Sequence, residues 1–300
     1  MGSAARRDRT EPLTRLVRFE ATDGVELSGL LYEPRRSNGR VAVYLHGTGG
    51  SSIFSSRRTN LLGAEFTKLG MAWLAFDNRG SHLVRRLGET LGGMAFERIR
   101  DCVHDIDGAL RLLRRRGYRD VTLIGHSTGA NKIAVYDFYK ERNPVRRYVL
   151  LAGGDDVGLM YQQLGTRRFR SALAKARLLR RKLDFVPPAI SEFPMSWRSL
   201  YDMINPDGHY NVFPFLEAMG RAKLSRRPLF RHLRQIRKPT LAIYGDRDEY
   251  CFGDVSACVA AMADALAGKS NFEFVIMKDA DHGFRGRDAE LVELIENWMS

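Results

Sequence analysis

The chain has 300 residues, of which 44 % are hydrophobic, and a formal net charge of +13. That hydrophobic share is ordinary for a globular protein. No uninterrupted apolar run approaches the roughly 20 residues that span a bilayer. The three cysteines lack metal-type spacing and make no disulfide framework. The cationic residues are spread along the chain, and no helix-turn-helix, zinc-finger or RNP pattern gathers them, so we predict a solvated basic surface with no nucleic-acid partner and no stable membrane association.

The first predicted segment is a flexible tail. Residues 1–14 are polar and arginine-rich and lack the apolar stretch of a secretory signal, so we expect a cytoplasmic protein. Residues 16–22 and 29–34 alternate between apolar and polar side chains on either side of Asp23 and Gly24, which predicts an opening antiparallel pair. Residues 41–45 are continuously apolar, as in a strand buried on both faces.

From there, short apolar runs alternate with longer amphipathic segments along most of the chain. We predict strands at residues 71–76, 121–125, 148–152, 240–244 and 272–277. We predict helices at residues 56–69, 96–115, 130–140, 255–267 and 288–299. This alternation is typical of an α/β fold in which helices flank a mostly parallel sheet, here of about eight strands.

The alternation stops between residues 155 and 238, which predicts a helical cap inserted into one core made of residues 15–154 and 239–300. Within the cap, apolar residues recur at helical spacing among arginines and lysines, as in a basic amphipathic helix with one face on the core. These apolar residues are Phe169, Leu173, Ala176, Leu179 and Leu183. An aromatic-rich segment follows, and such a segment over an active site can line an acyl or aryl pocket. Its candidates for substrate binding are Trp197, Tyr201, Tyr210 and Phe213.

The most informative motif is Gly125-His126-Ser127-Thr128-Gly129, which fits the pattern G-x-S-x-G. The pattern is weak alone, but here it follows the strand predicted at residues 121–125 and opens the helix predicted at residues 130–140. In that strand–turn–helix setting, called a nucleophile elbow, the serine sits on a tight, strained turn and its hydroxyl stands clear of the sheet. Ser127 is therefore the candidate nucleophile, in preference to a structural serine in a loop.

A serine hydroxyl needs a base to take its proton, and the base needs an acid that orients it. His282 lies between the last predicted strand and the last predicted helix, so we expect it to be the general base. The turn after the strand at residues 240–244 contains Asp246 and Asp248. We prefer Asp248 as the orienting acid and expect Asp246 to cap its own turn. The resulting triad has the order Ser, Asp, His that this fold imposes.

Acyl transfer also needs N–H donors for the oxyanion. The segment His46-Gly47-Thr48-Gly49-Gly50 follows the strand at residues 41–45, and its glycines let the backbone amides converge. We expect the amides of Thr48 and Thr128 to form the oxyanion hole. The segment fits neither the P-loop pattern nor G-x-G-x-x-G, which argues against a nucleotide site. No third ligand follows His46 and His126 at metal spacing, so we expect no metal and no cofactor.

These motifs, together with Asp77-Asn78-Arg79-Gly80 and Asp281-His282-Gly283, occur in an order that resembles the α/β-hydrolase superfamily from about residue 16 to the end. The segment Gly-His-Ser-Thr-Gly with a long cap is also similar, more distantly, to the branch that contains fungal siderophore-ester hydrolases. The sequence departs from many relatives after Gly80, where it continues Ser81-His82. The resemblance implies attack on an acyl carbon of a small-molecule ester or lactone.

We therefore expect a serine hydrolase that cleaves a carboxylic ester or lactone through an acyl-enzyme. An acyltransferase or thioesterase would use the same triad, and a non-catalytic binding protein would use the same scaffold. Serine at the elbow argues against the haloalkane dehalogenases and epoxide hydrolases, which are similar in fold but place an aspartate there. The arginine-rich cap favours an anionic or large polar ester.

Overall fold

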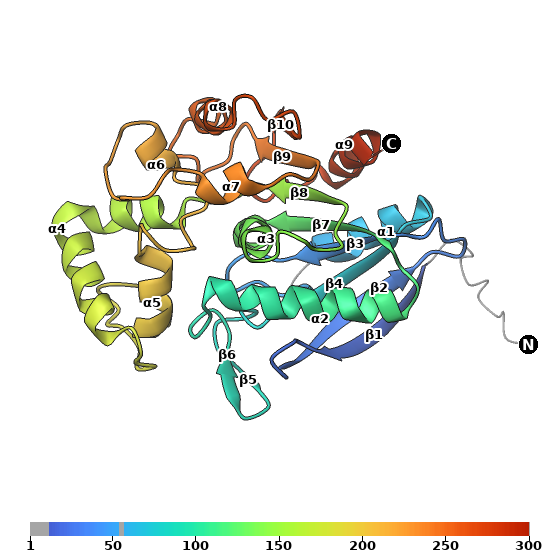
Figure 1. Cartoon of the computed structure of the whole chain (residues 1–300), viewed down its shortest axis with the longest axis horizontal. Helices are drawn as coiled ribbons and strands as arrows, with labels where there is room; N and C mark the ends of the chain where they lie inside the picture. The colour runs from blue at the N-terminus through green and yellow to red at the C-terminus, as the bar shows by residue number, and fades with distance from the viewer. Residues whose placement is uncertain (1–11, 54–56, 300) are drawn as a thin grey trace, which may run out of the picture.

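Within the described residues, 12–53 and 57–299, the computed structural model contains one sheet of eight strands in the order β1-β2-β4-β3-β7-β8-β9-β10 (Figure 1). The strands are β1 (Leu13–Glu20), β2 (Glu26–Glu33), β3 (Arg40–Leu45), β4 (Ala72–Asp77), β7 (Asp120–His126), β8 (Arg147–Leu151), β9 (Thr240–Gly245) and β10 (Phe272–Met277). β2 pairs antiparallel with both β1 and β4, and every other neighbouring pair is parallel. The predicted mostly parallel sheet is confirmed.

The hydrophobic pattern of each strand matches its place in the sheet. β3 and β4 lie inside the sheet, are almost wholly apolar and are buried on both faces. β1 lies at the edge and leaves its first four side chains exposed. The predicted tail needs a correction here: residues 1–11 lie outside the described part of the chain, but Leu13 and Thr14 belong to β1, where they pair with Glu33 and Tyr32.

Helices cover both faces of the sheet (Figure 1). The core helices are α1 (Arg57–Lys68), α2 (Cys102–Arg115), α3 (Thr128–Tyr139), α8 (Val255–Ala265) and α9 (Asp288–Met299). α2 packs against α3, and α1 packs against α9. Their sequences explain this packing: α2, for example, buries Ile106, Leu110 and Leu113, which recur on one face of the helix. The predicted α/β class with flanking helices is therefore correct.

Two local features differ from the sequence prediction. The helix expected from residue 96 starts with a short 3₁₀ turn, η1 (Ile99–Asp101), because Arg98 is extended and Glu97 turns its carboxylate into the interior. A small hairpin of β5 (Arg85–Leu87) and β6 (Thr90–Gly92) was not expected, since strands of three residues carry too little alternation to be recognised. Residue 56, the predicted start of α1, lies outside the described residues.

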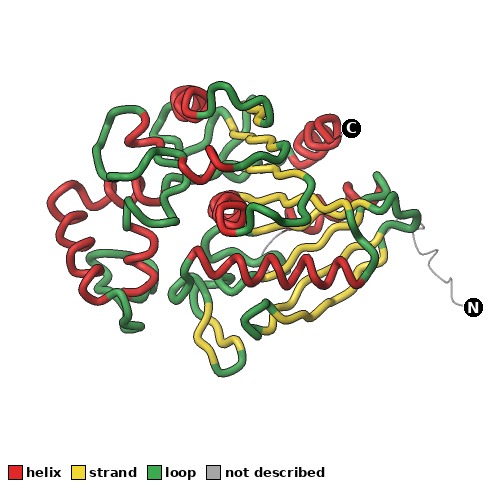
Figure 2. The backbone as a smooth tube through the Cα atoms, viewed as in Figure 1, coloured by secondary structure: helices red, strands yellow, loops and turns green. Residues whose placement is uncertain are grey.

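The described chain has four helices between β8 and β9: α4 (Asp156–Leu179), α5 (Trp197–Ile204), α6 (Phe215–Ala218) and α7 (Arg231–Gln235). Figure 2 shows α4, α5 and α6, with the loops between them, gathered beyond one end of the sheet. Gly165 interrupts α4 with φ 72° and ψ 162°, a conformation reserved almost entirely for glycine. The second half of α4 is the predicted basic helix, with Phe169 and Ala176 buried, whereas Leu183 lies beyond its end and is exposed. The boundaries of the cap as a domain stay a prediction.

Candidate active site

Ser127 stands on the turn between β7 and α3 with φ 55° and ψ −127°. Positive φ strains a non-glycine residue, and the close packing of strand and helix maintains the strain. A Cβ added at Gly125 would lie 2.3 Å from the carbonyl oxygen of Gly129, and one added at Gly129 would lie 2.1 Å from that of Leu45. Packing therefore requires both glycines of the motif, and the turn leaves Ser127 lining a cavity at the carboxyl end of β7.

His282 and Asp248 meet between the loops that follow β10 and β9. Nδ1 of His282 lies 3.0 Å from each carboxylate oxygen of Asp248. Asp248 is only 4 % exposed, so the contact is shielded from water. Asp246 has a different position from the one expected: its Oδ1 accepts a hydrogen bond from the backbone N–H of Ala280 at 3.2 Å. It ties the two loops together instead of capping its own turn, because Gly245 lets them approach closely.

Three residues that were not predicted hold His282 in place. Nε2 of His126 donates a hydrogen bond to the carbonyl oxygen of His282 at 2.8 Å. Oε2 of Glu249 accepts one from the backbone N–H of His282 at 3.1 Å. The Tyr250 ring packs edge-on against the imidazole, with ring centroids 4.6 Å apart. Both the main chain and the ring of His282 are therefore fixed. Adjacency to Asp248 and Ser127 was the only sequence signal for these residues.

The segment after β3 lies directly beside Ser127. A Cβ added at Gly47 would lie 2.9 Å from the Cβ of Ser127. The hydroxyls of Thr48 and Thr128 hydrogen-bond to each other and link the two segments whose amides were predicted as oxyanion donors. His46 anchors the segment, because its Nδ1 donates to the carbonyl of Gly47 at 2.8 Å while burial lowers its pKa to about 3 and keeps it neutral. These contacts hold the segment after β3 against the turn that carries Ser127.

Ser127, His282 and residues 46–50 line a cavity of about 800 Å³, a volume within the range of small-molecule sites. The opposite wall comes from the segment between β8 and β9. Its apolar contributors include Leu159, Met160, Met195 and Met203. Besides its histidines, the described lining contains three charged residues, Asp156, Glu192 and Arg285. The cavity therefore joins the candidate triad to the predicted cap.

The four aromatic residues expected to bind substrate lie elsewhere, and none of them lines this cavity; they are Trp197, Tyr201, Tyr210 and Phe213. Nζ of Lys175 lies 5.0 Å from the centre of the Trp197 ring, which packs against α4. The Phe213 ring fills the space beside Gly153, where an added Cβ would lie only 2.3 Å from it. The Trp197 and Phe213 rings are buried in these contacts, whereas Tyr44, Phe193 and Tyr250 line the cavity beside its methionines.

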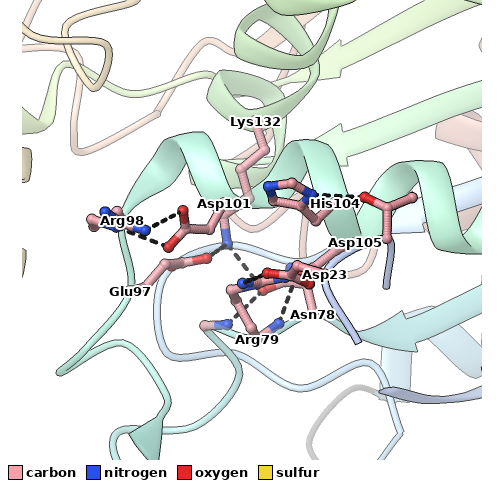
Figure 3. A network of polar contacts seen from close by, with 11 residues as sticks. Asp23, Asn78, Arg79, Glu97, Arg98, Asp101, His104, Asp105 and Lys132 are labelled. Atoms are coloured by element: carbon pink, nitrogen blue, oxygen red, sulfur yellow. Dashed lines mark hydrogen bonds and ion pairs between the residues drawn. The ribbon is translucent and has the colours of Figure 1, made fainter. Parts of the chain in front are cut away.

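A network of charged side chains reaches from α3 and α2 to the loop after β4 and holds residues 78–80 (Figure 3). Nζ of Lys132, on α3, lies 2.6 Å from the Glu97 carboxylate and 3.0 Å from Oδ1 of Asn78. Lys132 is 0 % exposed and Glu97 5 % exposed, so this pair is fully removed from water. The Arg79 guanidinium bridges two further carboxylates, those of Asp23 and Asp105. This network fixes the start of the loop that continues into Ser81 and His82.

No group of three or more His, Cys, Asp or Glu residues among positions 12–53 and 57–299 is arranged to hold a metal ion. His46 and His126 hydrogen-bond to backbone carbonyl groups instead. None of the helices in the described chain is both long and apolar enough to cross a membrane.

Comparisons with known proteins identify a family and a fold. The family model for alpha/beta hydrolases matches residues 42–294, whereas a search of curated proteins finds no significant match. Est1E from Butyrivibrio proteoclasticus, solved with ferulic acid bound, is 16 % identical, with 94 % of this chain and 98 % of that chain covered and a TM-score of 0.66. The Pyrococcus furiosus esterase Pf2001 is 14 % identical, with 100 % of this chain and 95 % of that chain covered and a TM-score of 0.60. The esterase EaEST from Exiguobacterium antarcticum is 15 % identical, with 95 % of this chain and 99 % of that chain covered and a TM-score of 0.57.

Proposed function

The chain belongs to the alpha/beta hydrolase family, and we propose that it is a serine-dependent hydrolase that cleaves a carboxylic ester or lactone through an acyl-enzyme. The observation that carries the proposal is the contact of His282 Nδ1 with both oxygens of Asp248, in the loops beside a cavity that Ser127 and His282 line. The esterases among the similar structures agree with this chemistry. The proposal assigns Ser127 as nucleophile, His282 as general base and Asp248 as orienting acid.

The first half of the reaction acylates Ser127. Asp248 accepts the Nδ1–H of His282, so the unprotonated Nε2 is the nitrogen that takes the hydroxyl proton of Ser127. Oγ then bonds to the acyl carbon, and the carbonyl electron pair moves to oxygen. The amides of Thr48 and Thr128 stabilise that oxyanion. When the carbonyl re-forms, the bond to the alcohol oxygen breaks, and the alcohol leaves with the proton from His282.

The second half releases the acid. Water gives a proton to Nε2 of His282 while its oxygen bonds to the acyl carbon, and the same amides hold the second oxyanion. Breaking the bond to Oγ returns the proton to Ser127 and frees the carboxylic acid. A lactone follows the same route and yields a hydroxy acid.

The direct test is hydrolysis of p-nitrophenyl esters from acetate to octanoate by the wild type and by Ser127→Ala. We expect the variant to lose about 10⁶-fold in kcat, as with other triad serines. Ser270→Ala, at an exposed loop serine, is the matched control and should behave as the wild type. Product analysis in the presence of an added alcohol separates hydrolysis from acyl transfer by the same residues. Undiminished turnover by Ser127→Ala, or no turnover by the wild type, contradicts the proposal.

A small-molecule substrate follows from the cavity volume under this proposal. The cytoplasmic location and the more distant resemblance to siderophore-ester hydrolases stay predictions.

A further inference from the structure

Away from Ser127, the wall of the cavity is largely apolar. Its apolar side chains include Leu83, Met94, Leu159, Met160, Met195 and Met203. Methionine side chains are flexible and polarisable, so they adapt to irregular apolar groups. The wall is therefore suited to a hydrocarbon chain, and any selectivity for charge must come from its few ionisable residues.

The three charged residues of the described lining, Asp156, Glu192 and Arg285, differ in their exposure to water. The Arg285 side chain is 83 % exposed, and its Nε lies 3.6 Å from the Asp281 carboxylate, so its charge is both screened and partly neutralised. Glu192 is also exposed. Asp156 is partly buried at the start of α4, and its Oδ2 accepts a hydrogen bond of 3.4 Å from Nδ2 of Asn131. Among the three, Asp156 has the charge that water screens least.

The groups that act on the Asp156 carboxyl come from several elements. His282 and Lys132 favour its charged form, Tyr210 is electrostatically coupled to it, and it acts in turn on the neighbouring Asp155. Lys132 is already paired with Glu97 at 2.6 Å. Desolvation outweighs the favourable charges and raises the pKa of Asp156 to about 7. Near neutral pH the carboxyl is thus poised between two forms, and a cation in the cavity would favour the ionised one.

We propose that Asp156 determines the charge of the bound substrate, which is an ester whose otherwise apolar chain carries a cationic ammonium group. An anionic chain would place a like charge beside a poorly solvated carboxylate and is rejected. This inference rests on the proposed ester hydrolysis. It runs opposite to the expectation from the arginine-rich cap, because Arg167, Arg170 and Arg177 of α4 face solvent and are absent from the described lining of the cavity.

The test uses two p-nitrophenyl esters of nearly equal length, a cationic 6-(trimethylammonio)hexanoate and an anionic heptanedioate monoester. The readout is the ratio of kcat/KM for the cationic and anionic esters. We expect a ratio above about 10 in the wild type and a fall of about tenfold in Asp156→Asn. Glu192→Gln removes an exposed charge from the same cavity and should change the ratio less than about twofold.

The pH dependence of this ratio gives a second readout that a structural role would not produce. Both substrates keep their charge between about pH 6 and about pH 8. Any pH dependence of the catalytic step that the two esters share cancels in the ratio. The ratio should rise with pH in the wild type as Asp156 ionises and stay level in Asp156→Asn.

Failure of the inference and failure of the proposed function are distinguishable. If the esters are hydrolysed but the ratio is the same in wild type and Asp156→Asn, Asp156 does not select charge, whereas the hydrolase stands. If no ester is hydrolysed, calorimetric binding of butyltrimethylammonium and pentanoate ions to both proteins measures the same preference without catalysis. Stronger binding of the cation by the wild type, reduced in Asp156→Asn, supports the inference, and equal binding of both ions overturns it.

Discussion

The imidazole of His282 is positioned by side chains from several loops. Asp248 holds Nδ1, Glu249 holds the backbone N–H, and His126 holds the carbonyl oxygen. With ring and main chain both restrained, Nε2 keeps one direction. In the mechanism we propose, the Asp248 carboxylate stabilises the imidazolium that forms when Ser127 loses its proton. The restraint at Nδ1 is the one that the proposed chemistry depends on most.

Replacing Asp248 by asparagine should lower kcat by about 10⁴-fold, because the amide favours the wrong tautomer of His282. Asp246→Asn is the matched control two positions away. Its carboxylate accepts from the backbone N–H of Ala280, a role that an amide oxygen can keep. Steady-state kinetics on one p-nitrophenyl ester compares the two variants. Equal losses of kcat in Asp248→Asn and Asp246→Asn would mean that Asp248 acts only through the shape of the loop.

Lys132 and Glu97 form a buried ion pair. Lys132→Met removes the cation and leaves a buried carboxylate unpaired, which should cost about 3–5 kcal/mol of unfolding free energy. Urea denaturation measures the loss. The double variant Lys132→Met with Glu97→Leu removes both charges and should recover most of the stability. If Lys132→Met alone is as stable as the wild type, the unpaired Glu97 carboxylate does not destabilise the folded state, and the prediction is wrong.

At the scale of elements, local patterns were sufficient for most of the core. β10 and α9 have the predicted bounds, residues 272–277 and 288–299, because each is a clear apolar or amphipathic run. The β5–β6 hairpin and the break at Gly165 were missed, since neither leaves a periodic signal. The four cap aromatics were misplaced for a different reason. Composition shows that a segment is aromatic, but tertiary packing decides which side chains face a cavity.

The start of α4 leads to a prediction about pH. Asp155 caps this helix by accepting the backbone N–H of Gly158 at 2.7 Å, and it also accepts that of Leu216 at 2.9 Å. Desolvation nevertheless raises its pKa to about 7. Because the folded state then holds a proton that the unfolded state has released, the stabilising contribution of Asp155 is full below the unfolded pKa, 3.8, and is lost as pH rises through about 7.

Thermal unfolding of wild type and Asp155→Asn between about pH 5 and about pH 8 checks this sign, since the other titrating groups are shared by both proteins. We expect the Tm of the wild type to fall relative to that of the variant as pH rises. A relative gain would mean that the two backbone donors outweigh desolvation and keep Asp155 ionised.

At the scale of the whole molecule, the parallel strands bring separate parts of the chain to one edge of the sheet. Ser127, Asp248 and His282 follow β7, β9 and β10, and Thr48 follows β3. Their approximate grouping was predictable because strand order and motif order agree. Asp156 follows β8 at the same edge but belongs to no motif, so only the folded chain shows that it lines the cavity. The net charge of +13 belongs to the whole chain and does not determine which charged residues line the cavity.

Mass mapping of the protein after reaction with a fluorophosphonate shows whether Ser127 is the nucleophile. We expect one adduct on the peptide that contains Ser127, and no adduct in Ser127→Ala. Prior incubation with a slowly hydrolysed ester should delay labelling by occupying the same oxygen. An adduct on another residue, or ester hydrolysis by a protein whose Ser127 stays unlabelled, would contradict the acyl-enzyme route through this serine.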